Sequence, residues 1–139
     1  MPQLIAEIEN EIVDDFALFD DQMQKYEYII DLGKKLAPLA PEYLQDDFLV
    51  KGCQSKVWLH AYMDNGLVYF EADSNSSIAK GIIAILIRVL SGQKPVDIVN
   101  AQLDFIDKTD LRSHLSSQRS NGLTAMIQRM KSFAASYAQ

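Results

Sequence analysis

The chain has 139 residues, of which 48% are apolar and 23% are charged, and its formal net charge is −6. This length and balance are typical of one soluble globular domain and exclude a disordered or collagen-like chain, so we expect a single domain over residues 1–139. Residues 1–32 carry nine acidic groups against one lysine. We expect no nucleic-acid partner for so acidic a chain, because phosphate contacts are made mainly by lysine and arginine.

Two amphipathic helices are predicted at the N-terminus. Apolar residues recur at steps of three and four over residues 5–19, which is the spacing of one helix face. Asp20 or Asp21 is predicted to cap a second helix, and Asp21 with Gln24 has the spacing of a capping box. We expect this second helix to end at Gly33, because glycine commonly follows the last helical residue.

A β-hairpin is predicted in the middle of the chain. A proline-containing connection at residues 36–41 precedes a short predicted strand at residues 48–50. The Asn-Gly dipeptide at 65–66 indicates a two-residue turn, and the register it sets places His60 opposite Glu71. Alternation along the two strands predicts that one face joins the core: Val57, Leu59, Ala61, Met63, Val68, Phe70 and Ala72.

Helices are predicted for most of the remaining chain. Residues 78–90 are apolar on nearly every side, which predicts a buried helix, and residues 73–77 supply several possible caps for it, Asp73 among them. Its longest apolar run is far shorter than the ~20 residues of a membrane span, so we expect no membrane partner. A short helix at 95–99, broken turns over 103–118 and a final helix from Ser120 or Asn121 complete the prediction. The expected fold is α+β, with a small antiparallel sheet flanked by helices.

The only cysteine, Cys53, follows Gly52 at the entrance of the hairpin. Structural zinc and iron–sulfur clusters need about three or four suitably spaced ligands, whereas this chain has one cysteine and two histidines. We therefore expect no metal site. A lone cysteine forms no internal disulfide, and the first residues resemble neither a secretory signal nor a transit sequence. Both features predict a cytoplasmic protein.

A cysteine hydrolase is one alternative for this thiol. His60 is a poor candidate for the activating base, because its predicted partner is Glu71 on the outer face of the hairpin. His114 lies in a loop-rich segment and stays open as a neighbour of Cys53. No oxyanion motif is visible, so the sequence disfavours hydrolase chemistry.

A purely structural role is the second alternative, because many single cysteines are small buried hydrophobic residues. Gly52 permits a left-handed or closely packed backbone next to Cys53. Lys51 and Lys56 flank the thiol in sequence, and their positive charge is expected to favour a thiolate. These features favour a reactive thiol at the rim of the hairpin.

Three segments resemble the SufE family of sulfur acceptor proteins, which includes CsdE. Residues 50–58 (VKGCQSKVW) are similar to the family motif [VI]-x-G-C-Q-S-Q-V-W. Residues 73–84 (DSNSSIAKGIIA) resemble D-S-D-A-A-I-V-K-G-L-I-A, and residues 114–123 (HLSSQRSNGL) resemble H-L-[ST]-P-S-R-S-N-G-L. The chain departs from these patterns at Lys56, at 75–77 and at 117–118, and none of the departures touches the cysteine.

The resemblance implies a sulfur carrier for Fe–S cluster assembly with an IscU-like fold. A cysteine desulfurase of the SufS type would hold sulfur as a persulfide, and Cys53 would accept that sulfur, stimulate the desulfurase and deliver the sulfur to a scaffold of the SufBCD type. The chain would be an accessory protein without a cofactor, because pyridoxal phosphate (PLP) belongs to the desulfurase. The alternative within the family is a CsdE-like acceptor that feeds another sulfur-transfer pathway. We expect a monomer or a weak homodimer.

The resemblance also implies roles for residues around Cys53, whose side chain would rest in an apolar pocket and swing outward at the partner. Four residues are expected to support the loop, with hydrogen bonds from the last two: Lys51, Gly52, Gln54 and Ser55. Three are candidates for contact with the partner: Arg119, Asp73 and His114. The simpler interpretations are an ordinary surface arginine for Arg119 and a helix cap for Asp73.

Overall fold

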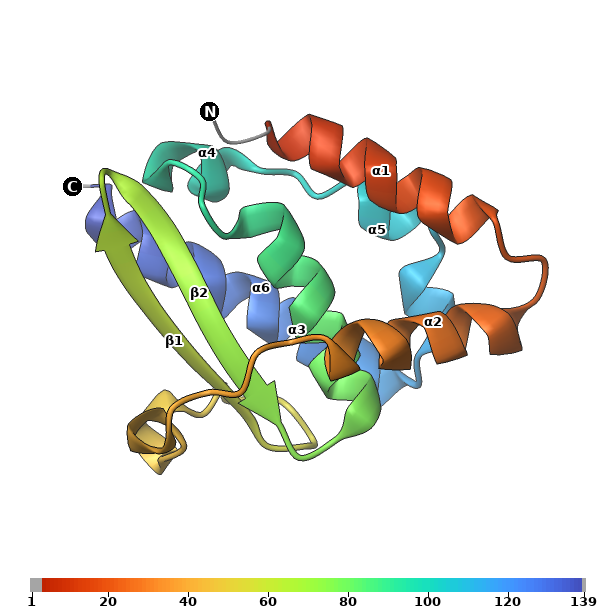
Figure 1. The fold of residues 1–139 in the computed structure, drawn as a ribbon, viewed down its shortest axis with the longest axis horizontal. Coiled ribbons are helices and arrows are strands. Elements are labelled where there is room, and N and C mark those ends of the chain that lie inside the picture. The colour runs from red at the N-terminus through yellow and green to blue at the C-terminus, as the bar shows by residue number, and fades with distance from the viewer. Residues whose placement is uncertain (1–3, 139) are drawn as a thin grey trace.

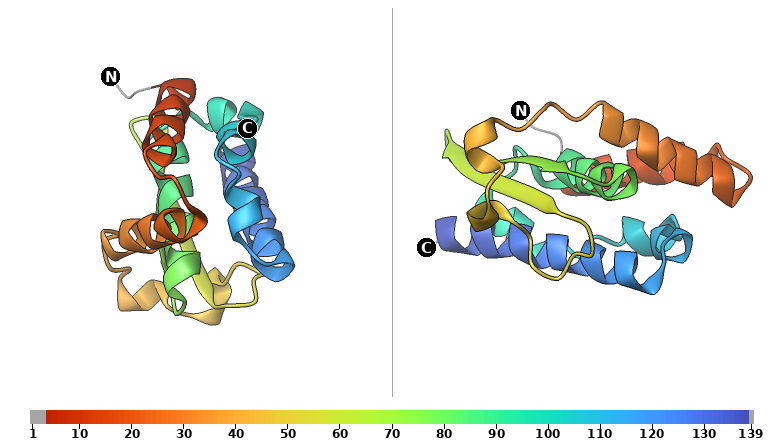
Figure 2. Two further views of the ribbon diagram at one scale, coloured as in Figure 1. Left: turned by 90° about the vertical axis from the view of Figure 1, so that its right-hand side faces the viewer. Right: turned by 90° about the horizontal axis from the view of Figure 1, so that it is seen from below.

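The computed structural model describes residues 4–138, apart from the side chain of His114, and it has the predicted α+β architecture (Figure 1). A two-stranded antiparallel sheet lies beside the central helix α3, with α6 on one side of α3 and α2 on the other (Figure 2). The helices and strands have these bounds: α1 Ile5–Ala17, α2 Gln22–Lys34, η1 Pro41–Tyr43, η2 Asp46–Phe48, β1 Val57–Asp64, β2 Leu67–Ser74, α3 Ser77–Leu90, α4 Pro95–Asn100, α5 Phe105–Lys108, η3 Leu111–His114 and α6 Ser117–Tyr137.

The two N-terminal helices form in the regions that the periodicity predicted, although α1 ends at Ala17 rather than at residue 19. Asp21 caps α2, because its Oδ1 accepts a hydrogen bond from the backbone N–H of Gln24 at 2.7 Å. The prediction that Gly33 ends α2 is wrong, since the helix continues to Lys34. Gly33 is needed for close packing instead: a Cβ there would lie 2.7 Å from the backbone nitrogen of Gly81 on α3. The two glycines therefore let α2 and α3 cross almost backbone to backbone.

The hairpin has the predicted register. Asp64 pairs with Leu67 across the Asn-Gly turn, and His60 pairs with Glu71. The predicted strand at 48–50 is wrong, because this segment contains the end of η2 and only a single bridge from Leu49 to Trp58. Five members of the predicted core face are buried: Val57, Leu59, Val68, Phe70 and Ala72. The prediction is wrong for Met63, which is exposed near the turn, and Ala61 is only partly buried.

The caps of α3 and α6 differ from the prediction. Ser76 caps α3 by accepting a hydrogen bond from Ala79 N–H, so the interpretation of Asp73 as the cap is wrong. Helix α6 begins at Ser117 rather than at 120–121, because Ser116 Oγ accepts a hydrogen bond from Arg119 N–H. Arg119 therefore lies in the first turn of a long helix. Within residues 4–138, no helix is long and apolar enough to cross a membrane.

Candidate functional site

The loop that carries Cys53 is held at both ends by the hairpin. Before the cysteine, Val50 is buried and its N–H donates to the carbonyl of Val57 at 2.8 Å. After it, Lys56 N–H donates to Asn75 Oδ1 at 3.1 Å, and Ser74 Oγ donates to the carbonyl of Lys56 at 2.7 Å. The thiol therefore lies on a short loop between two anchored points.

Glycine is required at position 52 for two reasons. The backbone φ of Gly52 is +96°, a conformation that residues with a side chain rarely adopt. A Cβ at this position would also lie only 3.2 Å from the Cβ of Ala125 on α6. The loop thus turns sharply while its backbone rests on α6, which directs the next residue, Cys53, toward that helix.

The thiol of Cys53 is half-buried against α6. Its Sγ lies 3.7 Å from the carbonyl oxygen of Gly122, to which the S–H can donate. Burial raises the pKa of the Cys53 thiol, because an apolar environment disfavours the charged thiolate. The expectation that Lys51 and Lys56 would favour a thiolate is wrong: both lysines are exposed, and burial dominates the environment of the sulfur.

A cavity of about 20 Å³ lies beside the sulfur. Its lining is apolar on one side, with Ala79 and Ile82 of α3 and Gly122 and Met126 of α6, and polar on the other, with Gln54, Ser55, Gln118 and Arg119. About 10–15 Å³ is enough to hold one water-sized atom. The space next to Sγ therefore fits one further atom of roughly that size. On the outer side of the loop, Cys53 borders an open depression together with Gln54, Gln118 and Asn121.

Arg119 connects the cysteine loop to the two helices that form the cavity. From α6, its Nη1 donates to Ser76 Oγ at 2.7 Å and to Ser55 Oγ at 3.4 Å. Ser76 is the cap of α3, and Ser55 follows Cys53 by two residues. Ser55 thus accepts a hydrogen bond from Arg119 of α6, which differs from the predicted bond to the loop backbone, and Gln54 is exposed at the rim.

Asp73, a predicted partner-contact residue, is not among the described residues that line this cavity. Asp73 pairs with Trp58 across the hairpin and forms an ion pair with Lys80 at 3.3 Å. His114 ends η3, and its side chain lies outside the described part of the structure, so its role stays a prediction.

The outer face of the hairpin explains His60 without catalysis. His60 Nδ1 lies 3.1 Å from Glu71 Oε1, as the register predicted, and its ring stacks on Tyr43 with the centroids 3.8 Å apart. Among the residues that the structure describes, no group of three or more Cys, His, Asp and Glu side chains could hold a metal ion. The described lining of the thiol cavity contains neither a carboxylate nor an imidazole.

Sequence reasoning missed several residues that build the cavity. Gly122 and Met126 follow Arg119 at helical spacing, so a correct start of α6 would have placed them on the same face. Ser76 was one of several possible caps of α3, and only its contact with Arg119 distinguishes it. Ala79 and Ile82 carry no chemical signal and were predicted only as part of a buried helix.

The fold and the site define a small α+β protein that encloses a single thiol between a glycine loop and two helices. A family model described as "SufE: Fe-S metabolism associated domain" matches residues 10–134. The chain belongs to the SufE family. This membership gives it a role in Fe–S metabolism as a sulfur acceptor, with sulfur-transfer partners.

Individual relatives agree with this assignment. The chain is 41% identical over 130 residues to a SufE-like protein of Rhizobium meliloti, covering 90% of this chain and 93% of the relative. It is 34% identical to a SufE-like protein of Synechocystis sp., covering 91% and 79% of the two chains. SufE-like protein 1, chloroplastic/mitochondrial, of Arabidopsis thaliana is 37% identical over 87% of this chain but only 33% of its own length.

A solved structure has the same fold. The solution structure of a hypothetical protein from Thermus thermophilus superposes with a TM-score of 0.78 and covers 94% of this chain and 96% of that one. The sequence identity is 17%, so this likeness concerns the fold alone.

Proposed function

We propose that Cys53 receives sulfur from a PLP-dependent cysteine desulfurase of the SufS type, holds it as a persulfide and passes it to a SufBCD-type scaffold. The observation that carries this proposal is the cavity of about 20 Å³ next to the thiol, which matches one additional sulfur atom. Transfer itself needs no metal and no cofactor on this chain. PLP acts on the desulfurase, where it supports release of sulfur from free cysteine.

The transfer step is a thiol exchange. The Cys53 thiolate attacks the outer sulfur of the donor's persulfide, so that a new S–S bond forms at Cys53 while the donor's S–S bond breaks. The electron pair of the broken bond leaves on the donor's cysteine, which takes up the proton that Cys53 released. No net oxidation or reduction occurs, because one persulfide is exchanged for another.

The resting geometry supports storage of the persulfide more than attack. Burial raises the pKa of the Cys53 thiol, so the unreactive thiol form dominates while Sγ lies against Gly122. Apolar walls would shield a persulfide in the same position from reductants and oxidants. Attack requires the thiolate, so Cys53 must move outward or meet positive groups of the donor. The φ of Gly52 marks it as a position at which the loop can turn.

Intact-mass spectrometry tests the proposal directly. After incubation with a cysteine desulfurase, PLP and cysteine, the wild-type chain should gain about 32 Da, the mass of one sulfur atom. Cys53→Ser should fold normally, gain no mass and leave the desulfurase unstimulated. Stimulation that persists in Cys53→Ser would instead show a structural adaptor, and turnover of esters without desulfurase would indicate a hydrolase.

A further inference from the structure

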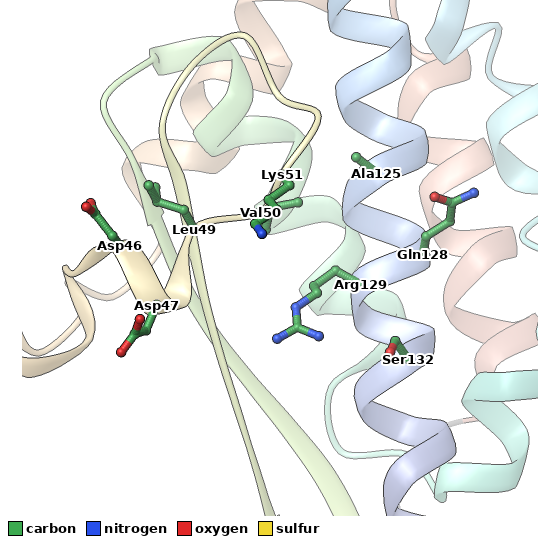
Figure 3. Close-up of a pocket in the computed structure, with 9 residues that line it drawn as sticks. All are labelled: Asp46, Asp47, Leu49, Val50, Lys51, Ala125, Gln128, Arg129 and Ser132. Carbon is green, nitrogen blue, oxygen red and sulfur yellow. The ribbon is translucent and has the colours of Figure 1, made fainter.

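A groove of about 610 Å³ lies between the segment that precedes Cys53 and the exposed side of α6 (Figure 3). One wall runs from η2 to Lys51, and the opposite wall is a stripe along α6 that includes Ala125, Arg129 and Ser132. The groove reaches the thiol loop, because Lys51 lines it and the neighbouring Gly52 rests on Ala125. Its volume is within the range of about 300–1,000 Å³ that is usual for ligand sites.

Arg129 differs from the other three arginines of the chain in the hydrogen bonding of its guanidinium group. The other three donate hydrogen bonds within the fold: Arg88 to Glu11 and Asp15, Arg112 to Ser120 and Thr124, and Arg119 to Ser55 and Ser76. Within the described residues, the guanidinium of Arg129 has no hydrogen-bond or ion-pair partner. It lies 4.0 Å from the centroid of the Phe133 ring and projects toward the opposite wall (Figure 3). Its position is thus held while its N–H donors stay available.

The remaining charges of the groove are also unpaired in the described part of the chain. Lys51 adds a second cation next to the thiol loop, and Asp46 and Asp47 lie on the wall that faces Arg129. None of the four groups forms an ion pair with another residue that the structure describes. The groove therefore presents separated charges of both signs beside the reactive loop.

We propose that this groove binds an extended segment of the sulfur-donating protein, with a carboxylate side chain of that segment held by Arg129 and Lys51. The inference rests on the proposed sulfur transfer, and it identifies where the donor docks. The donor's persulfide must reach the sulfur of Cys53, so the polypeptide that carries it must cross the surface close to this loop. The groove continues from the loop toward the C-terminal end of α6.

The dimensions and chemistry of the groove fit such a segment. The stripe from Ala125 to Ser132 spans roughly 10 Å at the rise of an α-helix, which matches about three residues of extended chain. A guanidinium binds a carboxylate through two parallel hydrogen bonds, and an ordered guanidinium loses little side-chain freedom on binding. Asp46 and Asp47 favour a basic residue on the other side of the same segment.

The test is a titration of desulfurase activity with increasing carrier. Arg129→Glu should raise the carrier concentration that gives half-maximal stimulation about tenfold or more, since close charge pairs across interfaces couple strongly. The maximal stimulation should stay unchanged, because Arg129 touches no reacting atom. Arg129→Lys keeps the charge but lacks the planar guanidinium, so its half-saturating concentration should lie between those of the wild type and Arg129→Glu. Lys35→Glu is the matched control: it makes the same charge change at an exposed residue outside the groove.

The outcomes separate this inference from the proposed function. If half-saturation of Arg129→Glu stays within twofold of the wild type while both chains gain sulfur, the docking site is wrong and the carrier function stands. If Lys35→Glu raised the half-saturating carrier concentration as much as Arg129→Glu does, the effect would come from net charge, and the proposal that the groove binds the donor would be wrong. If, without desulfurase, the sedimentation coefficient of Arg129→Glu differed from that of the wild type and of Lys35→Glu, the groove would instead be an interface between copies of the chain. A wild-type chain that gains no sulfur would overturn both proposals.

Discussion

Gly122→Ala should separate the stability of the fold from its capacity to hold a persulfide. Gly122 is buried inside α6, where replacing glycine by alanine stabilises a helix by about 1 kcal/mol. A Cβ at this position would lie 3.6 Å from Sγ of Cys53, which is an ordinary van der Waals distance. The thiol form should therefore tolerate the substitution, and its melting temperature should rise by about 3 °C.

The persulfide form should respond in the opposite sense. Gly122 lines the cavity in which we place the outer sulfur, so the added methyl group would compete with that sulfur for the space beside Sγ. Overpacking of a filled core costs roughly 1–3 kcal/mol. A cost near 1.4 kcal/mol corresponds to a change of about tenfold in the equilibrium between the enclosed and the exposed loop. The persulfide of Gly122→Ala should therefore be lost to a mild reductant about tenfold faster than that of the wild type.

The assay follows the sulfur by mass. Wild type and Gly122→Ala are loaded with sulfur, separated from the donor and sampled over time by intact-mass spectrometry in the presence of a mild reductant. Ser136→Ala serves as the control, because it raises helix propensity at an exposed position of α6 about four turns beyond Gly122. It also removes the hydrogen bond from Ser136 Oγ to the carbonyl of Phe133, which is remote from the thiol cavity. Equal lifetimes of the wild-type and Gly122→Ala persulfides would refute the assignment of the cavity.

Three further predictions concern the thiol and its support. Burial raises the pKa of the Cys53 thiol in the folded state, so the folded protein holds this proton more tightly than the unfolded chain does. The resulting contribution to the free energy of unfolding is complete below the pKa of an unfolded cysteine and is lost as the pH rises through the folded pKa. Denaturant titrations above pH 8 should show this decline for the wild type and not for Cys53→Ser. Arg119→Ala removes the hydrogen bonds to Ser55 and Ser76, so it should lower the free energy of unfolding by about 1–3 kcal/mol and accelerate alkylation of Cys53. Gly81→Ala should destabilise the fold by about 1–3 kcal/mol, because its Cβ would collide with the carbonyl oxygen of Ile29.

Each of these has an outcome that would contradict it. A pH dependence that is the same in wild type and Cys53→Ser would mean that other groups cause the decline. Unchanged alkylation of Arg119→Ala in the folded protein would show that Arg119 does not restrain the loop, even if stability falls. A melting temperature of Gly81→Ala equal to that of the wild type would mean that α2 can shift away from α3 at little cost.

Local signals in the sequence predicted local structure well. The Asn-Gly turn set the hairpin register, and with it the pairing of His60 with Glu71, because a two-residue turn leaves one alignment of the strands. Periodicity placed the helices, and Asp21 was identified as a cap because its hydrogen bond to Gln24 spans only three residues. The segment at 48–50 failed as a strand because so short a run makes only one bridge to β1.

The sequence by itself determined that one cysteine lies on a glycine-containing loop next to a hairpin, and the three motifs indicated the family. Only the tertiary structure decided the state of that thiol. The neighbouring lysines predicted a thiolate, but Gly122, 69 residues further along the chain, lies against the sulfur and helps to bury it. Gly33 similarly looked like a helix end because its true neighbour, Gly81, is distant in sequence. Burial and close approach depend on segments that meet only in the folded chain, so no local pattern records them.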